Sequence, residues 1–137
     1  MESNYNKIES IDSCIIMRII RGDNAEQKKL ATELLLSGKD YYVDDVAIME
    51  VVHVLTKARA TREYIADSLQ IFLDNPMIIY DKMFFAGIFE KYVAHPSLSF
   101  DDCVLEARIS MKRKEPLWTF DKKFAHQSDS ARLLTNQ

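Results

Sequence analysis

Four acidic residues occupy positions from which side chains could bind a divalent metal ion. Asp12 and Asp121 each follow a predicted strand, Asp102 lies in the first turn of a predicted helix, and Glu50 lies inside an apolar helix. Ligands of parallel sheets collect outside the carboxyl ends of the strands, so we expect these carboxylates near one edge of a sheet. Carboxylates that converge without enough cations repel one another, and Mg²⁺ or Mn²⁺, which take oxygen ligands, would remove that repulsion. The set therefore predicts a divalent-metal site.

Glu50 is the only acid between Val46 and Leu55, where His53 is the only other polar residue, so little of this helix is expected to face water. A buried carboxylate must be paired, protonated or bound to a metal, because an isolated buried charge is costly. An ion pair with a lysine or arginine is the alternative to a metal. His53 would complete a Glu-x-x-His pair of the di-iron kind, but the sequence contains no second such pair, so we expect a packed or rim histidine.

Helix capping offers another interpretation of several acids. It is sufficient for Asp44 and Asp45, which precede a predicted helix. Ser99 and Asp102 fit a capping box, and the helix dipole also favours an acid there. Asp101 is the alternative to Asp102 as the third acid of the set, and Glu106, one turn further on, would extend the acidic edge.

Local sequence signals predict helices alternating with short strands. Helices are expected over 25–36, 46–57, 62–73, 81–95 and 99–114, with one or two helical turns at 15–20; the expected caps include Asp23, Thr61 and Ser99. Strands are expected at 7–11, 41–43, 77–80, 117–119 and 132–134. Strands separated by helices need crossover connections, so the expected fold is a single three-layer α/β/α domain over 1–137 with a mainly parallel sheet of four or five strands.

The composition agrees with one helix-rich globular domain. The chain has 137 residues, of which 47% are hydrophobic, and its six Gly and Pro residues are too few for a disordered or collagen-like protein. A net charge of −3 excludes a surface that is basic throughout, so any nucleic-acid contact must be local. Two cysteines, acids within the N-terminal MESNYNKIES and the lack of a long uncharged apolar stretch predict a soluble, cytoplasmic protein with no membrane association.

Four segments carry a pattern that runs in order along nearly the whole chain. They are Ile11–Ile16, Glu50 within its apolar helix, Asp102–Ala107 and Leu117–Phe124, the last containing Thr119-x-Asp121-x-x-Phe124. Together they resemble the motifs of PIN-domain ribonucleases, and most closely the short VapC-like toxins of toxin–antitoxin pairs. Two features depart from the family: Cys14 stands where Asn or another polar residue is common, and Glu106–Arg108 is bulkier and more charged than usual.

The resemblance implies a PIN-like fold and a catalytic, metal-binding quartet of Asp12, Glu50, Asp102 and Asp121, with Ser13 and Thr119 as polar supports. The implied activity is hydrolysis of RNA phosphodiester bonds by an endoribonuclease that uses one or two Mg²⁺ or Mn²⁺ ions. The implied partners are an RNA substrate, a cognate antitoxin and a second copy in a homodimer. A catalytically silent PIN-like module that binds RNA or protein is the alternative.

The acidic chain has one basic stretch that could guide RNA. Between positions 108 and 123 it carries two acids and six basic residues, Arg108, Lys112, Arg113, Lys114, Lys122 and Lys123. A solvated helix end is the alternative for these charges. Trp118 could stack on a base but is expected in the core. The aromatic helix that carries Phe84, Phe85, Ile88, Phe89 and Tyr92 is expected to pack on the sheet, with any surplus apolar face forming a dimer contact or an antitoxin groove.

Overall fold

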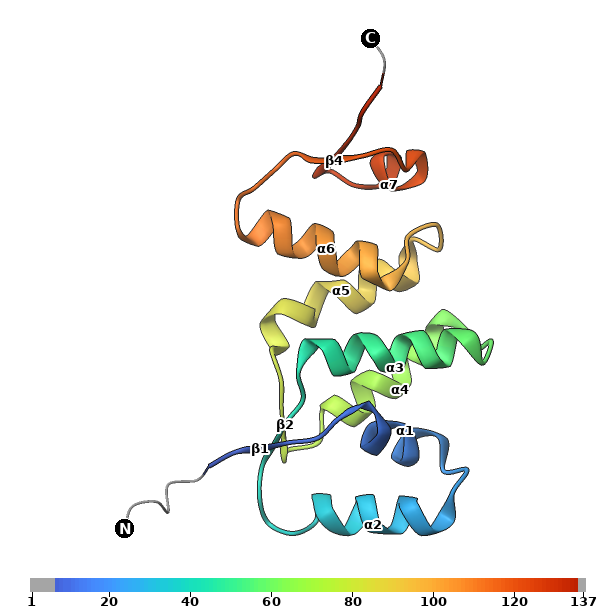
Figure 1. The fold of residues 1–137 in the computed structure, drawn as a ribbon, viewed down its shortest axis with the longest axis vertical. Helices are drawn as coiled ribbons and strands as arrows, with labels where there is room; N and C mark the ends of the chain where they lie inside the picture. The colour runs from blue at the N-terminus through green and yellow to red at the C-terminus, as the bar shows by residue number, and fades with distance from the viewer. Residues whose placement is uncertain (1–6, 136–137) are drawn as a thin grey trace. The chain divides into compact units, whose positions relative to one another are not determined.

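The computed structural model describes residues 7–135 as a mixed α/β chain with seven helices and five short strands, all paired in parallel (Figure 1). The strands form two small sheets, of three and two strands. Contacts divide the chain into two compact units, Met1–Asp81 and Lys82–Gln137. The α/β class and the parallel pairing are confirmed, but the predicted single sheet of four or five strands is wrong, because the strands divide into two sheets. The three layers and a single domain over 1–137 stay predictions. Among the described residues, no helix is long and apolar enough to cross a membrane.

The first unit contains a parallel sheet of β1 (Glu9–Ser10), β2 (Tyr41–Tyr42) and β3 (Ile78–Ile79), in that order. Parallel neighbours need a return path across the sheet, and helices provide it. The helices α1 (Ser13–Arg21) and α2 (Ala25–Leu35) connect β1 to β2, and α3 (Asp45–Lys57) and α4 (Arg62–Leu73) connect β2 to β3. All three strands therefore end at the same edge of this sheet, where α1 and α3 begin.

The predicted helical periodicity of α3 is confirmed on its core side. Ile48, Val51, Val52 and Leu55 are buried at the expected spacing. The opposite side of the same helix is less buried than its sequence predicted, because Val46 and Val54 are exposed. Packing against α1 and α4 covers α3 on one side and leaves the other open.

Most predicted helix ends are confirmed to within two residues, with two corrections, the first being that the helix predicted over 99–114 ends at Met111. Thr61 caps α4, and Gly22, at φ 64°, ends α1 in the left-handed conformation that glycine tolerates. The predicted cap of α2, Asp23, is wrong: Asn24 is the cap, and its side-chain oxygen accepts the Gln27 N–H at 3.0 Å. Asp23 instead pairs with Arg18 at 3.4 Å.

The second unit consists of two packed helices and a small strand–helix–strand motif. The helices are α5 (Lys82–Ala94) and α6 (Phe100–Met111); the motif is β4 (Leu117–Thr119), α7 (Lys122–Gln127) and β5 (Ala131–Leu133). β4 and β5 pair in parallel, and α7 packs against both.

An aromatic cluster forms the interface between α5 and α6. The Phe100 ring lies 6.3 Å from Phe85, in a stacked arrangement, and 5.3 Å from Tyr92, edge to face. The apolar face of α5 is buried throughout, from Phe84 to Tyr92. This face packs against α6, which corrects the prediction that it packs on the sheet, and none of its five predicted residues is left over as a surplus apolar face.

We expect Phe85→Ala to lower the free energy of unfolding by about 3–5 kcal/mol, because the fully buried ring leaves a cavity among its aromatic neighbours. Urea denaturation measures the change. Met83→Ala on the same helix is the control, since Met83 is 91% exposed and surface changes stay within about 0.5 kcal/mol. Equal effects of the two substitutions would contradict this packing.

Candidate active site

Three aspartates lie at the carboxyl edge of the first unit's sheet. Ser10, Tyr42 and Ile79 are register partners across β1, β2 and β3. Asp12, Asp44 and Asp81 each lie two residues after these strand ends. This edge is where parallel sheets bind ligands, so the predicted position of Asp12 is confirmed within this unit.

Asp12 is the N-cap of α1 and uses one carboxylate oxygen for that purpose. Its Oδ1 accepts the backbone N–H of Cys14 at 3.0 Å and of Ile15 at 3.3 Å. In the described part of the chain its Oδ2 accepts no hydrogen bond. Two backbone donors therefore fix the orientation of an exposed carboxylate and leave one oxygen for a ligand.

Ser13 and Glu50 lie together, although 37 residues separate them in the sequence. The Ser13 hydroxyl donates to Glu50 Oε1 at 2.9 Å, because α1 and α3 begin at the same sheet edge and pack against each other. The expected burial of Glu50 is wrong: it shares the open side of α3 with Val46 and Val54 and is exposed, as is His53. Glu50 therefore has access to solvent and to a ligand while Ser13 orients it.

Asp44 is a structural cap, as its sequence position suggested. Its Oδ2 accepts the Val46 N–H at 3.0 Å and its Oδ1 accepts the Tyr42 hydroxyl at 3.1 Å, so both oxygens are occupied. Burial and then the hydrogen bond to Asp44 raise the pKa of Tyr42, with further contributions from the charges of Asp44, Asp45 and Asp81. Tyr42 therefore stays a neutral donor at physiological pH and holds Asp44 in place.

In the second unit, Thr119 and Asp121 lie together at the end of β4. Thr119 Oγ1 accepts the backbone N–H of Asp121 at 2.9 Å. Thr119, which was predicted to support Asp121, therefore contacts the backbone of that residue directly. Asp121 then caps α7, with its Oδ1 accepting the Phe124 N–H at 3.0 Å. Its Oδ2 accepts nothing from the described residues, so Asp121 repeats the arrangement of Asp12: a fixed, exposed carboxylate with one oxygen open.

Asp102 lies in the first turn of α6, whose cap is Ser99. The Asp102 N–H donates to Ser99 Oγ at 3.0 Å. This is one of the two hydrogen bonds of a capping box. The second, from the Ser99 N–H to the Asp102 carboxylate, is not formed, because within the described residues that carboxylate accepts no hydrogen bond. Asp102 is half-buried whereas Asp101 is exposed.

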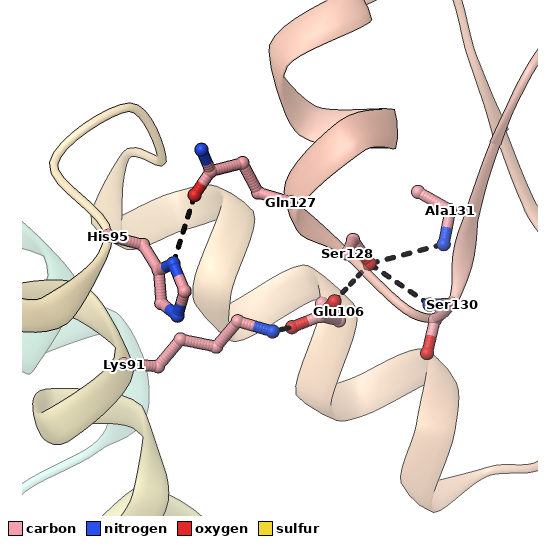
Figure 2. Close-up of polar contacts among 7 residues, drawn as sticks. All are labelled: Lys91, His95, Glu106, Gln127, Ser128, Ser130 and Ala131. Carbon is pink, nitrogen blue, oxygen red and sulfur yellow. Dashed lines mark hydrogen bonds and ion pairs between the residues drawn. The ribbon is translucent and has the colours of Figure 1, made fainter.

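Glu106 does not extend an acidic edge, which corrects the sequence interpretation. It is 7% exposed and forms an ion pair with Lys91 of α5 through Oε1, while Oε2 accepts the Ser128 hydroxyl (Figure 2). Ser128 Oγ in turn accepts the N–H groups of Ser130 and Ala131, each at 3.1 Å. Both oxygens of Glu106 are thus occupied, and the residue ties α5, α6 and the turn before β5 together. Beside it, His95 Nδ1 lies 2.9 Å from Gln127 Oε1 (Figure 2).

The six predicted RNA-contacting residues divide into two kinds. The Arg108 guanidinium lies 4.2 Å from the centre of the Phe84 ring, so it packs on the aromatic cluster instead of extending into solvent. The other five are exposed: Lys112, Arg113 and Lys114 after α6, and Lys122 and Lys123 on α7.

The donor chemistry of the four predicted ligands fits Mg²⁺ or Mn²⁺. Each has at least one carboxylate oxygen that accepts no hydrogen bond within residues 7–135, and carboxylate oxygen is the ligand type these ions prefer. Over the same residues, no group of three or more His, Cys, Asp or Glu side chains is gathered in a way that could hold a metal ion. The four-carboxylate site and its metal stay a prediction. Cys14 and Cys103 are free cysteines.

Comparison with protein-family models, with curated proteins and with solved structures finds no match to this chain.

Asp12→Ala is expected to destabilise the protein by about 0.5–2 kcal/mol, because α1 loses its cap, whereas Asp12→Asn keeps a capping oxygen and stays close to wild type. Urea unfolding of the two variants measures the difference. A loss of stability in Asp12→Asn as large as that in Asp12→Ala would show that the charge, and not the cap, stabilises this position.

Lys91→Met is expected to cost about 3–5 kcal/mol, because it leaves the buried Glu106 carboxylate without its cation. Glu106→Gln should cost less, since the amide still accepts from Ser128 and the Lys91 side chain, 29% exposed, can reach water. The double variant Lys91→Met/Glu106→Leu should recover part of the loss in thermal unfolding. No recovery would argue against an energetic coupling of this pair.

Proposed function

We propose that this protein is a metal-dependent endoribonuclease with a three-layer, PIN-like α/β/α fold, acting as the toxin of a toxin–antitoxin pair in the cytoplasm. One observation carries the proposal: Ser13 donates to Glu50 at 2.9 Å immediately beside Asp12. The PIN-like motif pattern implies that Ser13 is a polar support and that Asp12 and Glu50 are metal ligands. Nothing in the sequence separation of Ser13 and Glu50 requires them to be in contact. The contact of Thr119 with Asp121 supports the same interpretation in the second unit.

The proposed ligands are Asp12, Glu50, Asp102 and Asp121. A bound Mg²⁺ or Mn²⁺ would lower the pKa of a coordinated water and offset the charge of the scissile phosphate. Asp12 and Asp121 are held by backbone donors, so each presents an oxygen without having to change rotamer first. Ser13 restricts Glu50 through the opposite oxygen, and Thr119 fixes the backbone turn that carries Asp121. These contacts reduce the reorganisation that metal and substrate binding would otherwise require.

Asp12→Asn and Asp121→Asn should each abolish Mn²⁺ and Mg²⁺ binding in calorimetric titration and lower cleavage of a mixed cellular RNA pool at least about 100-fold. Both substitutions remove charge while keeping an oxygen for the cap. Ser13→Ala should lower metal affinity or activity about 10- to 100-fold, as loss of an outer partner does. Asp44→Asn is the matched control: it lies at the same sheet edge, but both of its oxygens are occupied.

Cleavage in wild type must also stop with EDTA. A folded wild type that binds neither ion at millimolar concentration would end the nuclease proposal and leave these acids as caps. Metal binding without cleavage of any RNA would favour the silent binding module instead. Activity of Asp12→Asn equal to that of Asp44→Asn would show that Asp12 is not a ligand.

A further inference from the structure

The outer face of the β4–β5 sheet carries exposed aromatic side chains, contrary to the prediction that Trp118 lies in the core. Trp118 is 54% exposed and Phe120, just after β4, is 78% exposed. Successive strand residues point to opposite faces of a sheet, and α7 packs against both β4 and β5. The half-buried Leu117 and Thr119 alternate with the exposed Trp118. We call Trp118, Phe120 and Arg132 the Trp118 face.

Arg132 connects this face to a basic groove. Arg132 is the register partner of Trp118, and its guanidinium lies 5.5 Å from the centre of the indole ring. It also lines a cavity of about 670 Å³ between α7 and β5, together with Lys122, Lys123 and His126. Of the described residues that line this cavity, three carry a permanent positive charge and none is a carboxylate. An aromatic surface thus adjoins a local excess of positive charge on a chain whose net charge is −3.

We propose that the Trp118 face binds unpaired RNA, with bases stacking on Trp118 and Phe120 while Arg132, Lys122 and Lys123 contact the phosphates. Aromatic rings beside lysine and arginine are the combination that recognises single strands, because every base offers a π-face and every nucleotide a negative charge. A paired strand hides its bases and offers only the charge. A partner protein would explain the aromatic rings but would not require a carboxylate-free groove with three cations. The choice of RNA over DNA rests on the proposed ribonuclease function.

The protein contains one tryptophan, so its intrinsic fluorescence reports directly on this face. Single-stranded oligouridylate, titrated in EDTA so that no cleavage occurs, should quench the emission of the wild type. Two controls, an RNA duplex of equal length and inorganic polyphosphate, should cause little quenching at the same phosphate concentration. The duplex has only paired bases and polyphosphate has none, so neither offers an unpaired base for stacking. Quenching by polyphosphate equal to that by the single strand would overturn the stacking proposal.

Variants separate stacking from charge, with binding followed by the anisotropy of a labelled single strand. Trp118→Leu should weaken binding roughly 5- to 150-fold, the range for loss of one base-stacking contact, and Trp118→Phe should restore most of it. Lys122→Gln/Lys123→Gln should reduce the slope of log K against log salt by about 1.4, because two phosphate contacts are lost. Lys28→Gln/Lys29→Gln, an adjacent exposed lysine pair on α2, is the matched control and should change neither quantity.

The outcomes distinguish this inference from the proposed function. Tight single-strand binding in EDTA that depends on Trp118, without Mg²⁺-dependent cleavage by the wild type, would support the face and end the nuclease proposal. Cleavage by Trp118→Leu with an unchanged KM for single-stranded RNA would overturn the face and leave the nuclease proposal intact. Self-association of the wild type that Trp118→Leu removes, measured by sedimentation without RNA, would also overturn the inference, because a second copy would then occupy the face.

Discussion

Parallel pairing of three very short strands determines where the side chains of the first unit lie. Because β1, β2 and β3 run in the same direction and in register, their carboxyl ends share one edge. The helices that return the chain must begin at that edge, so α1 and α3 start next to each other. This places Ser13 within 2.9 Å of Glu50 and sets Asp12 beside them. The sheet itself contributes few hydrogen bonds, but its direction decides which helix ends are neighbours.

The acids differ in how many of their two carboxylate oxygens accept a hydrogen bond or form an ion pair within the protein, and this number distinguishes acids that stabilise the fold from acids that can still bind a ligand. Asp44 and Glu106 use both carboxylate oxygens within the protein, one as a helix cap and the other in a buried ion pair and a serine contact. Asp12 and Asp121 use a single oxygen for capping, and Glu50 uses one for Ser13. Capping and ligand binding are therefore compatible roles for one aspartate, because a cap needs one oxygen and the dipole of the helix N-terminus favours the charge.

In the second unit, the two-stranded sheet leaves an aromatic side chain exposed to solvent. The helix α7 packs against both strands of this sheet, yet Trp118 in the middle of β4 stays in contact with solvent, between the half-buried Leu117 and Thr119. The apolar burial of this unit comes instead from the aromatic cluster between α5 and α6, closed on one side by Arg108 over Phe84. The Glu106 network then ties these helices to the turn before β5 (Figure 2).

Local sequence signals were sufficient for the helices α1 to α6, the short strands, the caps Asp44, Thr61 and Ser99, and the core side of α3, because each depends on residues within a few positions of one another. The short helix α7 (Lys122–Gln127) was not predicted. These signals also identified the acids with the chemistry of metal ligands. They misplaced Glu50, Trp118 and Glu106, whose surroundings come from distant parts of the chain: Glu106 meets residues 15 and 22 positions away, and Glu50 meets Ser13 across 37. Only the tertiary structure decides exposure and partners of this kind, because an apolar or charged residue is buried or open according to what packs over it, and periodicity along one helix or strand contains no information about that.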